Sequence, residues 1–178
     1  MIIKSAKLTF SIILILLSLS NILRSDEIKK IEFFGNDRIP NETILMFSEI
    51  KIGDNIDEEA LNQVLINLYN SNFFKDVKVE LVKNILKITV SENPLIEQIK
   101  FEGIKAKKIL ESIKEDLLLK SRTSYNEVIA KNDLKKMKSN LKGIGYFFSE
   151  VDLFVEDLDN NKVNLVYKIN LGNKSKIK

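Results

Sequence analysis

The amino-acid sequence predicts an α+β protein made of two tandem domains, each a small sheet with helices on one side. The first observation behind this prediction is an internal repeat, in which Ile31-Glu-Phe-Phe-Gly35 recurs as Ile99-Lys-Phe-Glu-Gly103. A second pair of motifs, Phe73-Phe74-Lys-Asp-Val77 and Tyr146-Phe147-Phe148-Ser-Glu-Val151, recurs at a similar spacing. This spacing is too long for a solenoid and long enough for a small domain with its own core. In both copies the hydrophobic period changes in the same order, which predicts β-α-α-β-β twice.

Residues 1–20 precede the first copy and predict a secretory signal peptide, with an uncleaved N-terminal anchor as the alternative. Lys4 and Lys7 come before an apolar segment at residues 10–19. This segment is shorter than the roughly 20 residues that cross a bilayer as a helix. Ser18 and Ser20 are small residues at the spacing that a signal peptidase accepts. Either alternative predicts that the bulk of the chain is exported.

The first copy begins with alternating apolar and charged residues at 28–34, which predict a strand that ends at the Gly35 turn. Pro40 then opens a short helix with a buried stripe at Ile44, Leu45 and Phe47. After this helix, Gly53-Asp54 breaks the chain.

A stronger helix begins at Asp57, whose carboxylate can cap the free amides. Its predicted buried face consists of apolar residues at helical spacing: Leu61, Val64, Leu65 and Leu68. Residues 77–81 and 86–90 then alternate with the strand period around a tight Lys83-Asn84 turn, which predicts a hairpin with one wet face.

The second copy repeats this order. The predicted elements are a strand at 96–102, a short helix at 105–115, a longer helix at 125–141, and strands at 150–156 and 162–170. Ser124-Tyr-Asn-Glu127 has the pattern of a capping box at the start of the longer helix. The face of that helix toward the sheet is predicted at Ala130, Leu134, Met137 and Leu141.

The residue types that are missing exclude several function classes. The chain contains no cysteine and no histidine. Thiol chemistry and disulfides are therefore excluded, and the usual general base near neutral pH and the commonest zinc ligands are absent. We predict a protein that is not an enzyme, with no catalytic, cofactor-binding or metal-binding residues. Asp157, Asp159 and Asn161 imitate the start of a calcium loop, but Lys162 and Lys168 occupy its glycine and glutamate positions, so a hairpin turn is the better interpretation.

Charge is distributed unequally between the copies. Residues 21–94 carry 9 basic and 13 acidic residues, whereas residues 95–178 carry 17 and 12. This asymmetry can align the two domains on a partner or on one another, but the field is modest beside that of a nucleic-acid binder. We therefore predict no nucleic-acid partner.

Several of these segments together resemble the POTRA domains of the BamA family of outer-membrane protein assembly factors. The resemblance rests on residues 31–39, 43–44, 68–69, 74–77 and 92–94, and the second copy fits the next POTRA domain. The sequence departs from the family at Ile104, where asparagine is usual, and at Asn70-Ser71-Asn72, which replaces a glycine.

The resemblance implies two POTRA-like domains, at residues 26–94 and 95–172, each with a three-stranded mixed sheet covered on one side by two helices. Residues 173–178 are then a tail or the start of a truncated third repeat. Family members continue into further POTRA domains and a membrane barrel. The resemblance therefore leaves two interpretations open, a partial product without its barrel and a stand-alone factor.

The resemblance also implies a function in the periplasm, where the family holds unfolded outer-membrane polypeptides and accessory assembly lipoproteins. The last strand of each family domain is central, so the preceding strand is an edge with unpaired backbone groups that an extended peptide can join. The predicted peptide-binding edges are Val77, Lys78, Val79, Glu80 and Leu81 in the first domain and Val151, Asp152, Leu153, Phe154 and Val155 in the second. The alternative is that charged side chains merely blunt these edges.

Two further groups of side chains are candidates for binding. Phe73, Phe74, Phe147 and Phe148 could clamp client chains, but core packing is the expectation that we favour. A lysine stripe, defined as Lys131, Lys135, Lys138 and Lys142, could bind anionic lipid headgroups or an acidic partner, but a solvated helix flank is the interpretation that we favour.

Three rival functions remain at this stage. A TamA-like translocation factor and an FtsQ-like, membrane-anchored division protein are rivals with the same domain type. A cytoplasmic RNA-binding βα-repeat protein is the rival from another class, and the export segment and near-neutral mature charge disfavour it.

Overall fold

The computed structural model describes residues 26–174. The signal peptide or anchor predicted at residues 1–20 lies outside this range, as do residues 175–178 of the predicted tail. Within residues 26–174, no helix combines the length and the apolar character that a membrane span requires.

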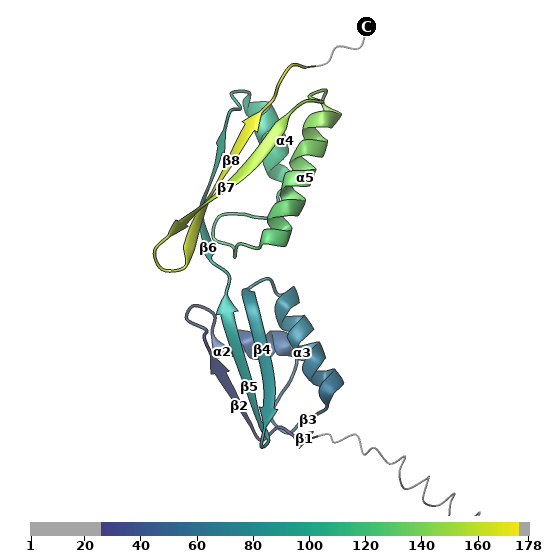
Figure 1. Ribbon diagram of the computed structural model, residues 1–178, viewed down its shortest axis with the longest axis vertical. Coiled ribbons are helices and arrows are strands. Elements are labelled where there is room, and N and C mark those ends of the chain that lie inside the picture. Colours follow the sequence, from purple (N-terminus) through teal and green to yellow (C-terminus); the bar gives the residue numbers. More distant parts are fainter. Residues whose placement is uncertain (1–25, 175–178) are drawn as a thin grey trace, which may run out of the picture.

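The described chain contains two three-stranded mixed sheets, each with two helices, and this confirms the predicted fold class (Figure 1). The first domain consists of β2 (Lys30–Phe34), α2 (Asn41–Ser48), α3 (Glu58–Asn70), β4 (Phe74–Val82) and β5 (Ile85–Glu92). Its strand order is β2-β5-β4, with β5 central, parallel to β2 and antiparallel to β4. A further pair that the sequence did not predict, β1 (Asp26–Glu27) and β3 (Asn55–Ile56), forms a small antiparallel ladder.

The second domain has the same topology. It consists of β6 (Leu95–Glu102), α4 (Lys107–Glu115), α5 (Glu127–Gly143), β7 (Glu150–Leu158) and β8 (Lys162–Asn170). Its strand order is β6-β8-β7, again with the last strand central. Figure 1 shows the two domains following one another along the long axis, with α4 and α5 beside the second sheet.

The caps of the two long helices were predicted with different success. Asp57 caps α3 as expected, because its carboxylate accepts from the Ala60 N–H at 2.8 Å. The capping box at Ser124 is wrong. Asn126 caps α5 instead, with its side-chain oxygen accepting from Val128 N–H at 2.9 Å and Ile129 N–H at 3.1 Å. Ser124 lies two residues before this cap, where it forms a β-bridge with Leu95.

Each domain encloses its own hydrophobic core, and the two buried clusters share no residue. The predicted faces of both long helices supply core residues, including Val64 and Leu68 from α3 and Met137 and Leu141 from α5. Leu65 is only half-buried and does not belong to the first cluster, so its place on the buried face was overestimated.

The repeated glycines, Gly35 and Gly103, end the first strand of each domain with positive φ, as a turn there requires. A Cβ atom at Gly35 would clash with the Val90 carbonyl oxygen, and one at Gly103 would clash with that of Ile169. The repeated motif is therefore a place where the backbones of the first and central strands approach closely.

The aromatic pairs differ between the domains. Phe74 is buried and Phe73 packs against the first core, as expected. Phe147 and Phe148, however, are 52% and 78% exposed, so the expected core packing is wrong for both. Tyr146 packs against the second core in their place, and the two phenylalanines lie in a turn before β7.

Candidate functional site: the open sheet edges

The two predicted peptide-binding strands lie at sheet edges. Within the described residues, β4 hydrogen-bonds only to β5, and β7 only to β8 (Figure 1). Each sheet also has a second edge, β2 and β6, which the sequence reasoning did not consider.

The strand ladder determines which β4 residues direct their backbone groups away from the sheet. The Asn84 carbonyl accepts from Lys29 N–H, so it points toward the β2 side of the sheet. The backbone groups of every second β5 residue, beginning with Leu86, therefore also point toward β2. The intervening residues face β4, where they pair with Lys78, Glu80 and Val82. The backbone groups of Val77, Val79 and Leu81 consequently point outward along the free edge.

Tyr69, near the end of α3, closes one end of the β4 edge. Its hydroxyl donates to Asp76 Oδ1 at 2.9 Å and accepts from the outward N–H of Val77 at 3.3 Å. An arriving peptide would have to displace this phenol to reach the Val77 donor. Only Val79 and Leu81 remain open to pair with a new strand.

The same reasoning applies to β7. The Asn161 carbonyl accepts from Leu95 N–H at 2.9 Å, so alternate β8 residues from Asn161 face β6. Lys162, Asn164, Val166 and Lys168 then face β7, where their partners are Leu158, Glu156, Phe154 and Asp152. The backbone groups of Val151, Leu153, Val155 and Asp157 therefore point outward.

Exposed apolar side chains accompany the β7 edge on both of its faces. Phe154 and Leu158 are 49% and 41% exposed on the outer face, and Val155 is 39% exposed on the face toward the helices. The Lys168 ammonium lies 4.6 Å from the centre of the Phe154 ring, which holds this ring over the central strand. The edge thus offers apolar contact area beside its backbone groups.

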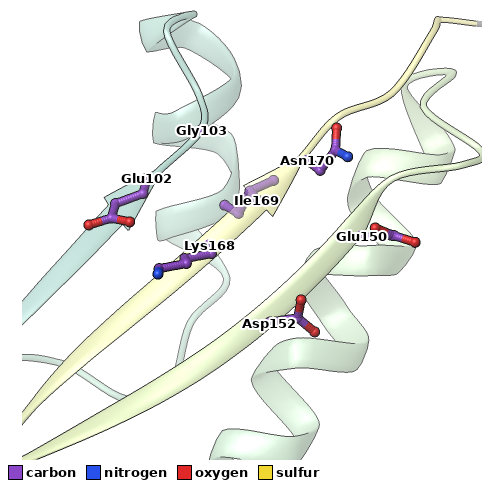
Figure 2. A pocket seen from close by; sticks show the side chains of 7 residues that line it. All are labelled: Glu102, Gly103, Glu150, Asp152, Lys168, Ile169 and Asn170. Carbon is purple, nitrogen blue, oxygen red and sulfur yellow. The ribbon is translucent and has the colours of Figure 1, made fainter.

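The outer face of the second sheet is also hollowed, with a volume of about 270 Å³ near the ends of its strands. Figure 2 shows Glu102, Lys168 and Asp152 on the three neighbouring strands, with the helices behind the sheet. These side chains are exposed, and among the described residues no group of three or more acidic side chains is placed to hold a metal ion. The hollow is an open, charged surface beside β7.

The lysine stripe lies on the solvent side of α5, and its four members are exposed. Lys131 is paired with Glu127 at 2.6 Å, one helical turn away. Their hydrogen bond lowers the pKa of Glu127 and raises that of Lys131. The structure thus arranges the lysines as a solvated flank, and their binding of anionic headgroups stays a prediction.

A polar joint connects the domains. Glu92 accepts from the N–H groups of Arg38 and Ile39 at 2.8 and 2.7 Å, and the Arg38 guanidinium donates to Asn93 O at 3.0 Å and to Ser124 Oγ at 3.4 Å. Asn126, the α5 cap, also donates to Asn72 Oδ1 at 3.1 Å. The chain crosses from β5 to β6 through hydrogen-bonded polar groups.

Two buried polar groups of the second domain were missed by sequence reasoning. Asp133 lies on the buried face of α5 and accepts from the backbone N–H groups of Leu118 and Leu119 at 3.0 and 2.9 Å. Tyr167 is fully buried on β8, and its hydroxyl has no hydrogen-bond partner among the described residues. A charged residue at a core position of a helical pattern was the available signal for Asp133.

Comparison with known proteins gives a consistent result. The model of the family POTRA, described as "Surface antigen variable number repeat", matches residues 27–93 and 94–172. The outer membrane protein assembly factor BamA of Neisseria meningitidis serogroup B is 27% identical over 171 residues, or 92% of this chain. The factor of the same name from Neorickettsia risticii is 24% identical over 152 residues, or 84% of this chain. The chain spans about a fifth of these relatives, with 21% and 20% of their lengths covered.

Solved structures with the same fold include two cyanobacterial ones. The N-terminal domain of Omp85 from Thermosynechococcus elongatus has a TM-score of 0.56 at 14% identity, covering 81% of this chain and 63% of that one. POTRA1-2 of the periplasmic domain of Omp85 from Anabaena has a TM-score of 0.51 at 12% identity, covering 81% and 95%. At these identities the likeness shows the fold alone.

Proposed function

Because the chain belongs to the POTRA family, with two consecutive domains of the BamA and Omp85 type, we propose that it is a periplasmic scaffold of outer-membrane protein assembly. It binds unfolded client polypeptides by adding them as strands to its open sheet edges. The names of the BamA relatives support the assignment to outer-membrane protein assembly. Their matches extend over both domains, which supports the tandem arrangement.

The observation that carries this proposal is the set of outward backbone groups on β4 and β7. Unpaired N–H and C=O groups at an edge accept an extended chain without regard to most of its side chains. Such tolerance suits a scaffold that meets many unfolded clients. The function requires no catalysis and no cofactor, in keeping with the absence of histidine and cysteine.

The domain assignment that goes with this function is residues 26–94 and 95–172, with a signal peptide or anchor before them and a tail or third repeat after them. Accessory assembly lipoproteins are the second class of partner, at edges that clients leave free. Anionic lipid headgroups at the lysine stripe are the third, and the exposure of its four side chains supports that contact.

The test is a titration of the whole chain with a fluorescent peptide copied from a transmembrane strand of an outer-membrane protein. Proline at Val79 and at Val155 removes one outward N–H from each edge and leaves the ladder bonds to β5 and β8 in place. We expect the double variant to bind the peptide about tenfold more weakly than the parent chain.

A matched control places proline where a helix tolerates it. Glu58 is the first residue of α3, a position at which the N–H has no partner within the helix. The Glu58→Pro variant should bind the peptide like the parent chain. Unchanged affinity in a folded double variant would rule out both edges as the binding site.

A further inference from the structure

We propose that β7 is the preferred docking edge of this chain, and that it selects an extended segment with basic residues on one face and apolar residues on the other. This inference rests on the proposed function, because it concerns the same edge site. It adds the choice between the two edges and the chemical class of the client segment.

The first step is that the two edges are not equally open. The carbonyl of Tyr69 accepts from Asn72 N–H, and the carbonyl of Lys142 accepts from Gly145 N–H, so Tyr69 and Lys142 hold equivalent positions at the two helix ends. Lys142 has no phenol with which to cover the start of β7. Val77 and its counterpart Val151 are nevertheless both buried, at 5% and 1% exposed. Beyond them, the outward residues of β4, Val79 and Leu81, are half-buried, whereas Val155 and Asp157 of β7 are exposed, so β7 is the more open edge.

The second step is charge. The second domain has an excess of basic residues, but β7 carries only acidic ones: Glu150, Asp152, Glu156 and Asp157. All four are exposed, and none forms an ion pair with another described residue. In β4 the charges are balanced, with Lys78 and Glu80 paired at 2.9 Å. Of the two predicted edges, β4 and β7, only β7 thus has a net charge to offer an arriving strand.

The third step is the arrangement of these charges on the two faces of the strand. Asp152, Phe154 and Glu156 share the outer face, and Leu153 and Val155 share the face toward the helices. A strand added beside β7 places its own side chains next to these, face by face. The complementary segment has basic residues on either side of an aromatic residue on one face, and apolar residues on the other.

A second copy of this chain is a poor occupant of the same edge. Pairing β7 with another β7 would bring its acidic side chains next to one another, and like charges on adjacent strands are destabilising. The same charge disfavours an anionic lipid surface at this edge. The edge therefore favours a client over self-association.

The experiment compares two synthetic peptides of about ten residues, the length of a typical strand. One alternates valine with lysine around a central phenylalanine on the lysine face, and in the other glutamate replaces every lysine. Fluorescence anisotropy measures their binding to the whole chain at low salt. We expect the lysine peptide to bind about tenfold more tightly, the effect of two or three favourable cross-strand pairs.

Four variants locate this preference. Asp152→Lys/Glu156→Lys should reverse the preference, and Glu111→Lys/Glu115→Lys, with the same charge change on exposed α4 positions, should retain it. Val155→Pro should weaken binding of the lysine peptide about fivefold, and Val79→Pro should weaken it less. Both charge-reversal variants change exposed residues only, so each should fold.

The outcomes separate this inference from the proposed function. Equal affinity for the two peptides, a preference that survives Asp152→Lys/Glu156→Lys, or a larger loss in Val79→Pro than in Val155→Pro would overturn the inference and leave edge binding intact. Binding of neither peptide would overturn both. Concentration-dependent dimers that involve β7 would show that self-association occupies the edge, and would also overturn the inference.

Discussion

At the scale of single residues, Tyr69 shows how one side chain changes the use of an edge. Its hydroxyl accepts from the Val77 N–H, which would otherwise face solvent or a peptide. Backbone donors at a free edge exchange with water unless a partner protects them. The phenol therefore decides whether the β4 edge begins at Val77 or at Val79.

We predict that Tyr69→Phe makes the Val77 amide exchange with deuterium faster, while the amides of Lys78 and Glu80, which face β5, keep their protection. Because Tyr69 is 37% exposed, loss of its hydroxyl should cost about 1 kcal/mol or less of unfolding free energy. Hydrogen-exchange NMR on the folded chain checks this. Equal exchange of Val77 in both proteins would mean that Tyr69 does not protect this donor.

Tyr167 leads to a prediction about pH. Burial, and to a lesser extent the nearby Asp133 carboxylate, raises the pKa of Tyr167 above its ordinary value of 10.0. A raised pKa in the folded state means that the unfolded chain ionises first, so this contribution to stability is present below pH 10 and is lost as pH rises above it. Stability in the alkaline range therefore falls partly because of this residue.

We predict that Tyr167→Phe removes this part of the loss of folding stability at alkaline pH. The variant also lacks the unpaired buried hydroxyl, so at neutral pH it should be as stable as the parent to within about 1 kcal/mol. Urea unfolding of both proteins at pH about 8 and about 11 measures the difference. A difference that does not change between the two conditions would contradict the prediction.

At the scale of elements, the sequence pattern predicted the helices and strands that bury one face, because such elements have a regular spacing of apolar residues. The stripe from Val64 to Leu68 and the hairpin alternation around Lys83-Asn84 each reflect one core-facing side, and both were found. The pair β1 and β3 has two residues per strand, too few to form a period. The exposed Phe147 and Phe148 were misassigned because a hydrophobic residue in a turn resembles a core residue when only its type is known.

Less of the candidate site than of the fold could be predicted from the sequence. The position of β4 and β7 at edges came from the family resemblance, since hydrophobic pattern alone does not set strand order. The outward direction of alternate backbone groups depends on the ladder register, and the position of Tyr69 over Val77 depends on how α3 packs. Neither has a signature in the sequence.

The start of α5 supports a prediction about caps. Asn126 accepts from two N–H groups of the first turn, whereas Ser124 lies in a β-bridge. Asn126→Ala should lower the unfolding free energy of the second domain by about 1 kcal/mol, and Ser124→Ala should lower it less. Thermal unfolding followed by circular dichroism compares the two.

Asn126→Asp is the rescue variant for this cap. Aspartate keeps an oxygen for the two N–H groups but cannot donate to Asn72 as the amide does. Most of the stability should return in this variant. If Ser124→Ala proved the more damaging change, the capping box predicted from sequence would be the better description.

At the scale of the whole molecule, the separation of the two cores determines how the chain unfolds. No buried residue belongs to both clusters, and the joint between the domains consists of polar hydrogen bonds through Arg38, Asn126 and Asn161. Polar contacts of this kind couple neighbouring domains weakly compared with a shared apolar core. Each domain should therefore behave as its own cooperative unit.

Leu68→Ala tests this independence. Leu68 is fully buried in the first core, so its truncation should lower the unfolding free energy of that domain by about 2 to 5 kcal/mol. The amides of the second domain should keep their protection from hydrogen exchange, because Leu68 does not belong to the second core. Hydrogen exchange read at Leu86 and Ile88 of β5 and at Leu165 and Tyr167 of β8 follows the two cores within one sample. Equal loss of protection in both would show that the polar joint transmits stability between the domains, and the edges of β4 and β7 would then have to be treated as one coupled binding unit.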